Sequence, residues 1–334
     1  MSEHRSSERV LVAGATGYIG RHVVQELLRR GYQVAAIVRP RSGIGATDSL
    51  ADVQEQLAGA TVLEAQVTDS QELSQVLNDH HADVVISCIA SRTGEPSDAW
   101  AVDCEANQRL LTHAVRMRAR QFVFLSAICV QKPLLEFQRA KLAFERELRD
   151  APLDHSIVRP TAFFKSLAGQ IGRVREGRPY LLLGNGQMTA CAPISERDLA
   201  TFIVDCVCDP SKRNSTLPIG GPGPVLTPRE QGQMLFRLLN APERFRSVPL
   251  WFFDAIVAGL RIAGIFSKRI RAKYELARIG RYYATESMLH WDPAQERYRP
   301  ELTPSFGSES LEDFYRRAIE RDDPSAELGD HSVF

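Results

Sequence analysis

Three glycines, Gly14, Gly17 and Gly20, are spaced three residues apart near the start of the chain. Residues 10–13 precede them as an apolar run, and the apolar side chains of residues 19–28 then fall on one helical face. The first glycine permits a sharp turn, the second a close approach of a ligand to the backbone, and the third tight packing of helix on strand. The pattern predicts a strand–turn–helix unit that binds a dinucleotide pyrophosphate at the positive end of the helix dipole. A purely structural glycine turn is the alternative.

Short apolar runs and helical patterns alternate through the first half of the chain. Runs that are apolar on both faces are typical of strands buried in a parallel sheet with helices on its two sides. The expected strands cover residues 10–13, 34–38, 61–67, 84–89, 122–126 and 156–158, and further helices are expected at 101–117 and 135–148. This alternation predicts an α/β fold, a Rossmann-type doubly wound parallel sheet with a smaller, mainly helical C-terminal substrate lobe.

After Pro160 the alternation stops. Helices are expected at residues 163–175, 196–208, 228–239, 250–265 and 310–319, and the Pro- and Gly-rich residues 217–224 are expected to form a rigid turn. We therefore expect a nucleotide-binding domain at residues 8–160 and a substrate lobe at 161–320, some segments of which return to the sheet. Residues 321–334 are polar and acidic, and a flexible tail is expected there.

The composition is that of a soluble globular protein, with 44% apolar and 25% charged residues. Lys and Arg balance Asp and Glu at 41 each, so we expect no nucleic-acid partner. The cysteines and histidines lack the spacing of a metal site, which predicts free thiols in a reducing compartment and no metal. Residues 1–9 contain no signal-peptide core, and the apolar residues 248–266 are interrupted by Asp254 and Arg261. We expect a cytoplasmic protein without a transmembrane span.

The second expected strand ends in Arg39, where sites for NAD carry a carboxylate that holds the ribose 2′-hydroxyl. A guanidinium suits the 2′-phosphate of NADPH by its charge and its bidentate geometry. Arg41 and Ser42 follow and can contribute to the same phosphate site. The pattern favours NADPH over NADH, and a solvated surface arginine is the alternative.

Further cofactor contacts are expected at the carboxyl ends of the other strands. Asp69 can accept a hydrogen bond from the adenine amino group, although an acid after a strand is also a common helix cap. Arg159 can anchor the cofactor or the substrate, with a structural ion pair as the alternative. The complete expected cofactor set is Gly14, Thr16, Gly17, Tyr18, Ile19, Gly20, Arg39, Arg41, Ser42, Asp69, Cys88, Ala90, Lys141, Arg159 and Pro160.

The fifth strand and the helix after it resemble the short-chain dehydrogenase/reductase superfamily. Its proton relay combines a strand-end serine with a tyrosine and a lysine that lie four residues apart on one helix face. Ser126 and Lys141 match this pattern and are expected to be catalytic, but Phe137 occupies the tyrosine position. Without the phenol, alcohol oxidation and sugar epimerisation lose their acid–base group. A reductase of carbon–carbon double bonds and a nucleotide sensor without catalysis remain as interpretations.

Longer segments resemble the NADPH-dependent divinyl chlorophyllide 8-vinyl reductase family, an atypical branch of that superfamily. They lie at residues 87–92, 125–141, 157–167, 191–195, 217–223 and 280–288, and the resemblance runs from about residue 10 to residue 319. It implies that NADPH reduces the 8-vinyl group of a divinyl (proto)chlorophyllide to ethyl in (bacterio)chlorophyll biosynthesis. Hydride added to the outer vinyl carbon leaves charge spread through the macrocycle, so no oxyanion requires a phenol. The proton can come from Lys141, another side chain or water.

A flat tetrapyrrole substrate requires a mostly apolar pocket with few polar anchors. The expected substrate-binding residues are Phe137, Phe163, Phe164 and Lys165, the last as a partner for the substrate carboxylate. Core packing of the two adjacent phenylalanines and a solvated lysine are the alternatives. The apolar helix that begins near Trp251 is interpreted as core, with a substrate lid or a membrane contact as alternatives.

Two other functions stay open at this point. One is an isoflavone-reductase-like NADPH-dependent reductase of a phenolic substrate, and the other is a non-catalytic NADPH-binding regulator or assembly factor. The resemblance to plant enzymes, which carry a transit extension that this chain lacks, implies a bacterial member in the cytoplasm, with peripheral contact to the photosynthetic membrane as a further expectation. The sequence predicts no oligomeric state.

Overall fold

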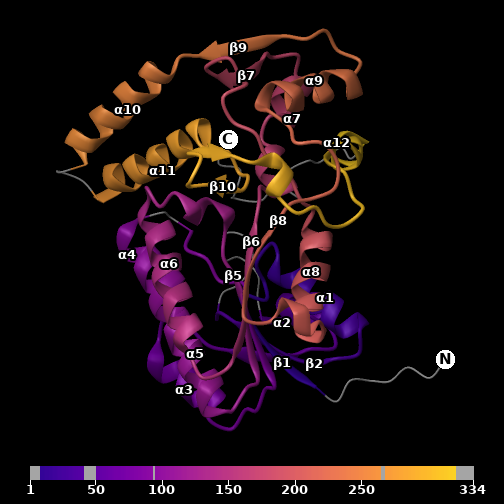
Figure 1. Ribbon diagram of the computed structural model, residues 1–334, viewed down its shortest axis with the longest axis vertical. Coiled ribbons are helices and arrows are strands. Elements are labelled where there is room, and N and C mark those ends of the chain that lie inside the picture. The colour runs from indigo at the N-terminus through magenta and orange to yellow at the C-terminus, as the bar shows by residue number, and fades with distance from the viewer. Residues whose placement is uncertain (1–7, 41–49, 93–94, 265–267, 321–334) are drawn as a thin grey trace.

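A computed structural model describes residues 8–40, 50–92, 95–264 and 268–320. Its main element is a sheet of seven parallel strands in the order β3-β2-β1-β4-β5-β6-β8 (Figure 1). The strands are β1 (Arg9–Ala13), β2 (Gln33–Val38), β3 (Thr61–Glu64), β4 (Val84–Ser87), β5 (Gln121–Leu125), β6 (Asp154–Pro160) and β8 (Ser215–Ile219). The predicted Rossmann-type sheet is confirmed.

Helices cover both faces of the sheet because successive strand residues point to opposite sides. Val10 and Val12 of β1 belong to one apolar core, while Leu11 and Ala13 belong to the other. The first core is closed by α1 (Gly20–Arg29), α2 (Leu50–Gln56) and α8 (Glu196–Cys208). The second is closed by α3 (Ser70–Leu77), α5 (Asn107–Arg116) and α6 (Glu136–Asp150), and Figure 1 shows the two helix layers on either side of the strands.

The segment before α5 departs from regular α-helix. A short helix, α4 (Pro96–Ala99), runs into a π-helical turn, η2 (Trp100–Ala106), before α5 begins. The single helix expected at residues 101–117 is therefore wrong in its first part. π-Helical turns are rare and are frequent at functional sites, because the extra residue per turn redirects side chains.

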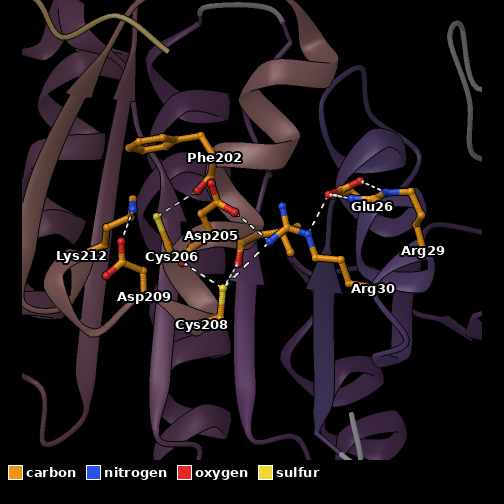
Figure 2. Close-up of polar contacts among 10 residues, drawn as sticks. Glu26, Arg29, Arg30, Phe202, Asp205, Cys206, Cys208, Asp209 and Lys212 are labelled. Atoms are coloured by element: carbon orange, nitrogen blue, oxygen red, sulfur yellow. Dashed lines mark hydrogen bonds and ion pairs between the residues drawn. The ribbon is translucent and has the colours of Figure 1, made fainter. Parts of the chain in front are cut away.

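Helices α1 and α8 lie far apart in the sequence and pack side by side. Arg30, at the end of α1, donates to Glu26 and to Asp205 of α8, each at 2.7 Å (Figure 2). The Arg30 thus bridges the two helices at the ends remote from the glycine turn. Helix α8 therefore belongs to the sheet layer although it lies far along the chain.

The remaining elements form the C-terminal lobe. A third apolar core there combines α7 (Ile171–Arg175), α9 (Pro228–Leu238) and α12 (Leu311–Glu320) with the strand β7 (Tyr180–Leu183). β7 pairs in parallel with β9 (Phe245–Val248), and β10 (Trp291–Asp292) pairs with β11 (Arg297–Tyr298). Short 3-10 turns in the described residues of both parts of the chain are η3 (Ile128–Gln131), η4 (Phe164–Leu167), η5 (Pro210–Lys212) and η6 (Pro300–Leu302).

Two expectations for this half of the chain are wrong. The helix expected at residues 163–175 consists of the turn η4 and the separate short helix α7. The Pro-rich segment expected as a turn begins with β8, which pairs with β6 at the sheet edge. Pro218 is tolerated there because an edge strand does not need every backbone donor.

Helices α10 (Leu250–Ala263) and α11 (Lys268–Thr285) form a hairpin at the periphery of the lobe (Figure 1). α11 reaches back over the carboxyl edge of the sheet, where Tyr282 donates to the carbonyl oxygen of Cys129 at 2.9 Å. Within the described ranges, no helix combines the length and apolarity needed to cross a bilayer.

Candidate active site

The carboxyl ends of the parallel strands meet at one edge of the sheet. β1 lies between β2 and β4, so the order of strands reverses at β1. Open α/β sheets bind their ligands outside the carboxyl ends of the strands at such a reversal. The expected cofactor residues after β1, β4, β5 and β6 are gathered at this edge.

The glycine turn between β1 and α1 has the geometry of a dinucleotide cradle. Gly14 has a φ of 79°, and a Cβ there would lie 2.8 Å from the backbone carbonyl of Cys88. A Cβ on Gly20 would lie 2.0 Å from the carbonyl oxygen of Gly14, so helix and turn meet without room for a side chain. No side-chain hydrogen bond caps α1 at Ile19. Its N-terminal backbone donors therefore fit a pyrophosphate.

Tyr18, within the glycine motif, connects the turn to two other segments. Its hydroxyl donates to Glu196 of α8 at 2.7 Å, and its ring lies 6.2 Å from the ring of Phe163. The Lys165 ammonium lies 5.0 Å from the Tyr18 ring centroid, in a cation–π arrangement. Burial, and then the charge of Glu196, raise the pKa of Tyr18 well above its usual range. Tyr18 is therefore a neutral hydrogen-bond donor within this cluster.

Arg39 directly follows β2. Burial lowers the pKa of its guanidinium, and the nearby charge of Arg92 lowers it further. The positive charge of Arg92 therefore acts on Arg39, and positive charge at this place suits a phosphate better than a ribose hydroxyl. Arg92 was not identified from the sequence. Arg41 and Ser42 lie outside the described residues.

Asp69 and Cys88 have clear structural roles at this edge. Asp69 accepts from the backbone N–H groups of Gln71 and Glu72 at 2.8 and 3.0 Å, so the helix-cap alternative is observed and the adenine contact stays a prediction. The backbone N–H of Cys88 donates to the carbonyl oxygen of Ala13 at 2.9 Å, while Ala90 is exposed.

Among the described residues, no three His, Cys, Asp or Glu side chains are grouped to hold a metal ion.

Lys141 forms a buried ion pair that the sequence did not reveal. Its Nζ lies 2.9 Å from Oδ1 of Asp103, and the other carboxylate oxygen accepts from Ser91 at 2.6 Å. Asp103 lies in the π-helical turn η2, which directs its side chain toward α6. Both side chains are almost completely buried. The carboxylate therefore fixes the position of the ammonium near the carboxyl end of β5.

Ser126 is held in a second buried network. Its hydroxyl donates to Glu145 of α6 at 2.6 Å, and the same carboxylate receives Arg149 at 2.8 Å and both Nε and a terminal nitrogen of Arg159. The ion-pair alternative for Arg159 is thus observed, and its cofactor contact stays a prediction. Because the Ser126 proton is engaged by Glu145, the serine oxygen can accept a hydrogen bond but cannot donate one to an oxyanion.

The Glu145 network predicts a pH dependence of stability. Burial raises the pKa of Glu145, but the Arg159 hydrogen bond and charge and the Ser126 hydrogen bond outweigh it, and the pKa falls below its ordinary value of 4.5. A depressed carboxyl pKa contributes stability above the unfolded-state value, and this is lost as the pH falls through the folded-state value. In Glu145→Gln, we expect a lower free energy of unfolding at pH 7 and a weaker loss on acidification below about 4.5.

Denaturant unfolding between pH 3 and 7 measures both effects. The control is Glu147→Gln, an exposed acid on the same helix, which should retain the acid dependence of the unmodified chain. Equal slopes for the Glu145→Gln and unmodified chains would contradict this assignment.

An apolar cluster lies at the carboxyl edge, around Phe137. Its buried members come from the turn η3, from the residue before α6, from α11 and from two segments outside these elements: Ile128, Cys129, Leu135, Cys191, Tyr282 and Met288. The partly buried members include Ala127, Phe137, Ala162 and Tyr283. A phenol, Tyr283, therefore packs in the same cluster as the phenylalanine that replaces the expected tyrosine. Burial raises the pKa of Tyr283 well above its usual range, so that the phenol is neutral.

The three expected substrate residues after β6 lie in different surroundings. Phe163 is partly buried beside Tyr18, and Lys165 is buried. Phe164 is fully buried in the C-terminal core, with its ring 5.5 Å from Phe314. That burial fits the core alternative and leaves Phe164 no surface for a substrate. Pro160 is buried at the end of β6.

Comparisons with known proteins agree with this architecture. Residues 14–210 match a family model described as NAD(P)H-binding. A solved structure titled "AtPrR2 with NADP+ and (+)pinoresinol" superimposes with a TM-score of 0.65 over 93% of this chain and 99% of that chain, at 18% identity, which shows the fold alone.

Two curated plant proteins are much more similar in sequence. The chloroplastic divinyl chlorophyllide a 8-vinyl-reductase of Oryza sativa subsp. indica is 50% identical over 98% of this chain and 83% of the rice protein. The protein of the same name from Arabidopsis thaliana is 48% identical over 96% of this chain and 79% of its own length. This identity extends through both the sheet and the C-terminal lobe. The chain therefore belongs to the divinyl chlorophyllide a 8-vinyl-reductase family of NAD(P)H-binding oxidoreductases.

Proposed function

We propose that this protein reduces the 8-vinyl group of a divinyl chlorophyllide or protochlorophyllide to ethyl, with NADPH as reductant. The observation that carries the proposal is the near 50% identity to enzymes of that name over almost the whole chain. The site supports the same chemistry, because its helix offers Lys141 without a tyrosine at position 137. Reduction of a conjugated carbon–carbon bond creates no localised oxyanion that needs a phenol donor.

NADPH, when bound, supplies the hydride, and the residues of the chain align and screen the reacting groups. The glycine turn and the N-terminus of α1 would hold the pyrophosphate, and Lys141, fixed by Asp103, would hold the nicotinamide ribose hydroxyls. Phe137 and Phe163 offer apolar surface to the flat macrocycle, and Lys165 is a partner for its carboxylate. In this site Ser126 would accept a hydrogen bond from a bound group, because its own hydroxyl donates to Glu145.

The finer assignments are the phosphorylated cofactor, the pigment and the location. Arg39 beside Arg92 supports NADPH over NADH, because two guanidinium groups favour a 2′-phosphate. A tetrapyrrole is the substrate that the apolar cluster and the buried lysine suit. We assign the reaction to a bacterial cytoplasm, with peripheral contact to the photosynthetic membrane.

Incubation of the purified protein with NADPH and divinyl chlorophyllide tests the proposal. The expected result is a blue shift of the Soret band, with one NADPH oxidised for each ethyl group formed. Two results would each overturn it. Turnover of a phenolic substrate with no change in the pigment would favour an isoflavone-reductase-like enzyme. Tight NADPH binding without turnover of any pigment would favour a non-catalytic regulator or assembly factor.

A further inference from the structure

Helix α10 exposes large apolar side chains that no other described segment covers. Trp251, Phe252, Ile256 and Ile262 are 69%, 48%, 39% and 65% exposed. In α10 no residue is fully buried, and its half-buried side chains Phe253, Val257 and Leu260 recur at helical spacing toward α11. The core interpretation of this helix is therefore wrong. One stripe packs on α11, while the opposite side presents aromatic and aliphatic groups outward.

The same hairpin has a local excess of positive charge in a protein that is neutral as a whole. The full chain has 41 basic and 41 acidic residues, whereas residues 250–285 contain seven Lys or Arg and two Asp or Glu. The bases are Arg261, Lys268, Arg269, Arg271, Lys273, Arg278 and Arg281. Both acids are already paired, Asp254 with Arg281 and Glu275 with Arg278. Arg261, Arg271 and Lys273 are exposed, so the apolar helix has a basic border.

We infer that α10 docks on an anionic lipid bilayer and lies in the plane of the interface. Tryptophan and phenylalanine would enter the boundary between headgroups and acyl chains, where amphipathic aromatic rings are favoured. The basic border would contact the lipid phosphates, which attract Lys and Arg near the surface. A helix of 14 residues is about 21 Å long, too short to span the hydrocarbon core.

Charge complementarity favours a lipid surface, rather than a second copy of the chain, as the partner of α10. A twofold contact through α10 would bring two basic borders together, whereas anionic headgroups complement them. The inference does not depend on the proposed reaction, because neither cofactor nor pigment takes part in lipid binding. A membrane-bound enzyme would nevertheless meet an amphiphilic pigment where such pigments partition.

Co-sedimentation of the full-length protein with vesicles, in the absence of NADPH and pigment, tests the inference. We expect binding to vesicles that contain phosphatidylglycerol and at least tenfold weaker binding to pure phosphatidylcholine. Trp251→Gln/Ile262→Gln should lower partitioning to anionic vesicles roughly tenfold or more, because two large apolar groups are lost. Arg271→Glu/Lys273→Glu should weaken binding to anionic vesicles and reduce its salt dependence.

The matched control is Val115→Gln, which removes a 38%-exposed apolar side chain from the far helix α5 and should bind vesicles like the unmodified protein. Thermal unfolding of each variant checks that the fold is retained. Equal binding by the α10 variants, or no binding to anionic vesicles, would overturn the inference. So would concentration-dependent self-association in sedimentation velocity that Trp251→Gln/Ile262→Gln abolishes, since the face would then be a dimer contact. Turnover is not a readout here, so failure of the reaction assay leaves this result intact.

Discussion

Lys141→Met is expected to lower pigment turnover by roughly a hundredfold or more and to destabilise the fold. The turnover should fall because the ammonium that we propose positions the nicotinamide ribose is lost, and small misplacements of reacting atoms carry penalties of that size. The stability falls because Asp103 remains buried without its cation, 2.9 Å from where the ammonium was. Removal of one partner from a buried ion pair costs about 3–5 kcal/mol. Steady-state turnover and denaturant unfolding measure the two effects.

The double variant Lys141→Met/Asp103→Asn separates the proposed role of Lys141 in positioning the cofactor from its role in the stability of the fold. Replacing the stranded carboxylate by a neutral amide of similar shape removes the buried charge, so most of the lost stability should return. Turnover should stay low, because the amide does not replace the ammonium. Recovery of turnover together with stability would show that Lys141 acts only in the fold.

The glycine turn and most of the sheet could be predicted because their signals are local. Gly14, Gly17 and Gly20 stand in one short segment, and each strand of the sheet except β8 is a short apolar run in the sequence. Strand order and helix layers then follow from the parallel connections. Even here the ends of elements shifted by a few residues, since hydrogen bonding at helix and strand termini depends on neighbours.

The partners within the site could not be predicted, because they depend on contacts between distant segments. Asp103 reaches Lys141 because a π-helical turn precedes α5. The periodicity of residues 96–107 does not indicate such a turn. Glu145 looks like one more acid on an amphipathic helix, yet it is fully buried between Ser126 and Arg159. The sequence allowed two roles for Arg159, as an anchor for a ligand or as a member of a structural ion pair. The ion pair with Glu145 is visible only once α6 packs on β6.

Composition misled the interpretation of two segments. Residues 217–224 are rich in Pro and Gly, which predicts a turn, but β8 gains its hydrogen bonds from β6, a strand some sixty residues earlier. The apolar helix α10 has the composition of a core element, yet it lies at the periphery. Hydrophobicity alone does not predict which segment covers an apolar helix, because the covering segment is determined by tertiary packing.

Arg39→Asp is expected to reverse the cofactor preference. The guanidinium can make two charge-assisted hydrogen bonds to a 2′-phosphate, each contributing about 1.5–3 kcal/mol. Their loss, together with repulsion by the new carboxylate, should raise the KM for NADPH on the order of a hundredfold or more. The same carboxylate can accept from the 2′-hydroxyl of NADH, so that cofactor should be used as well as before or better. Initial rates with each cofactor at saturating pigment give both values.

Arg29→Asp provides the matched control, because it makes the same change of charge at a side chain that is 69% exposed. Arg29 is the last residue of α1, a helix of ten residues and about 15 Å, whose first residue, Gly20, belongs to the glycine turn. A general loss of positive field would affect both variants equally, whereas a phosphate contact affects only Arg39→Asp. An unchanged KM for NADPH in Arg39→Asp would remove Arg39 from the 2′-phosphate site. Arg92, the cation beside it, would then be the next residue to replace.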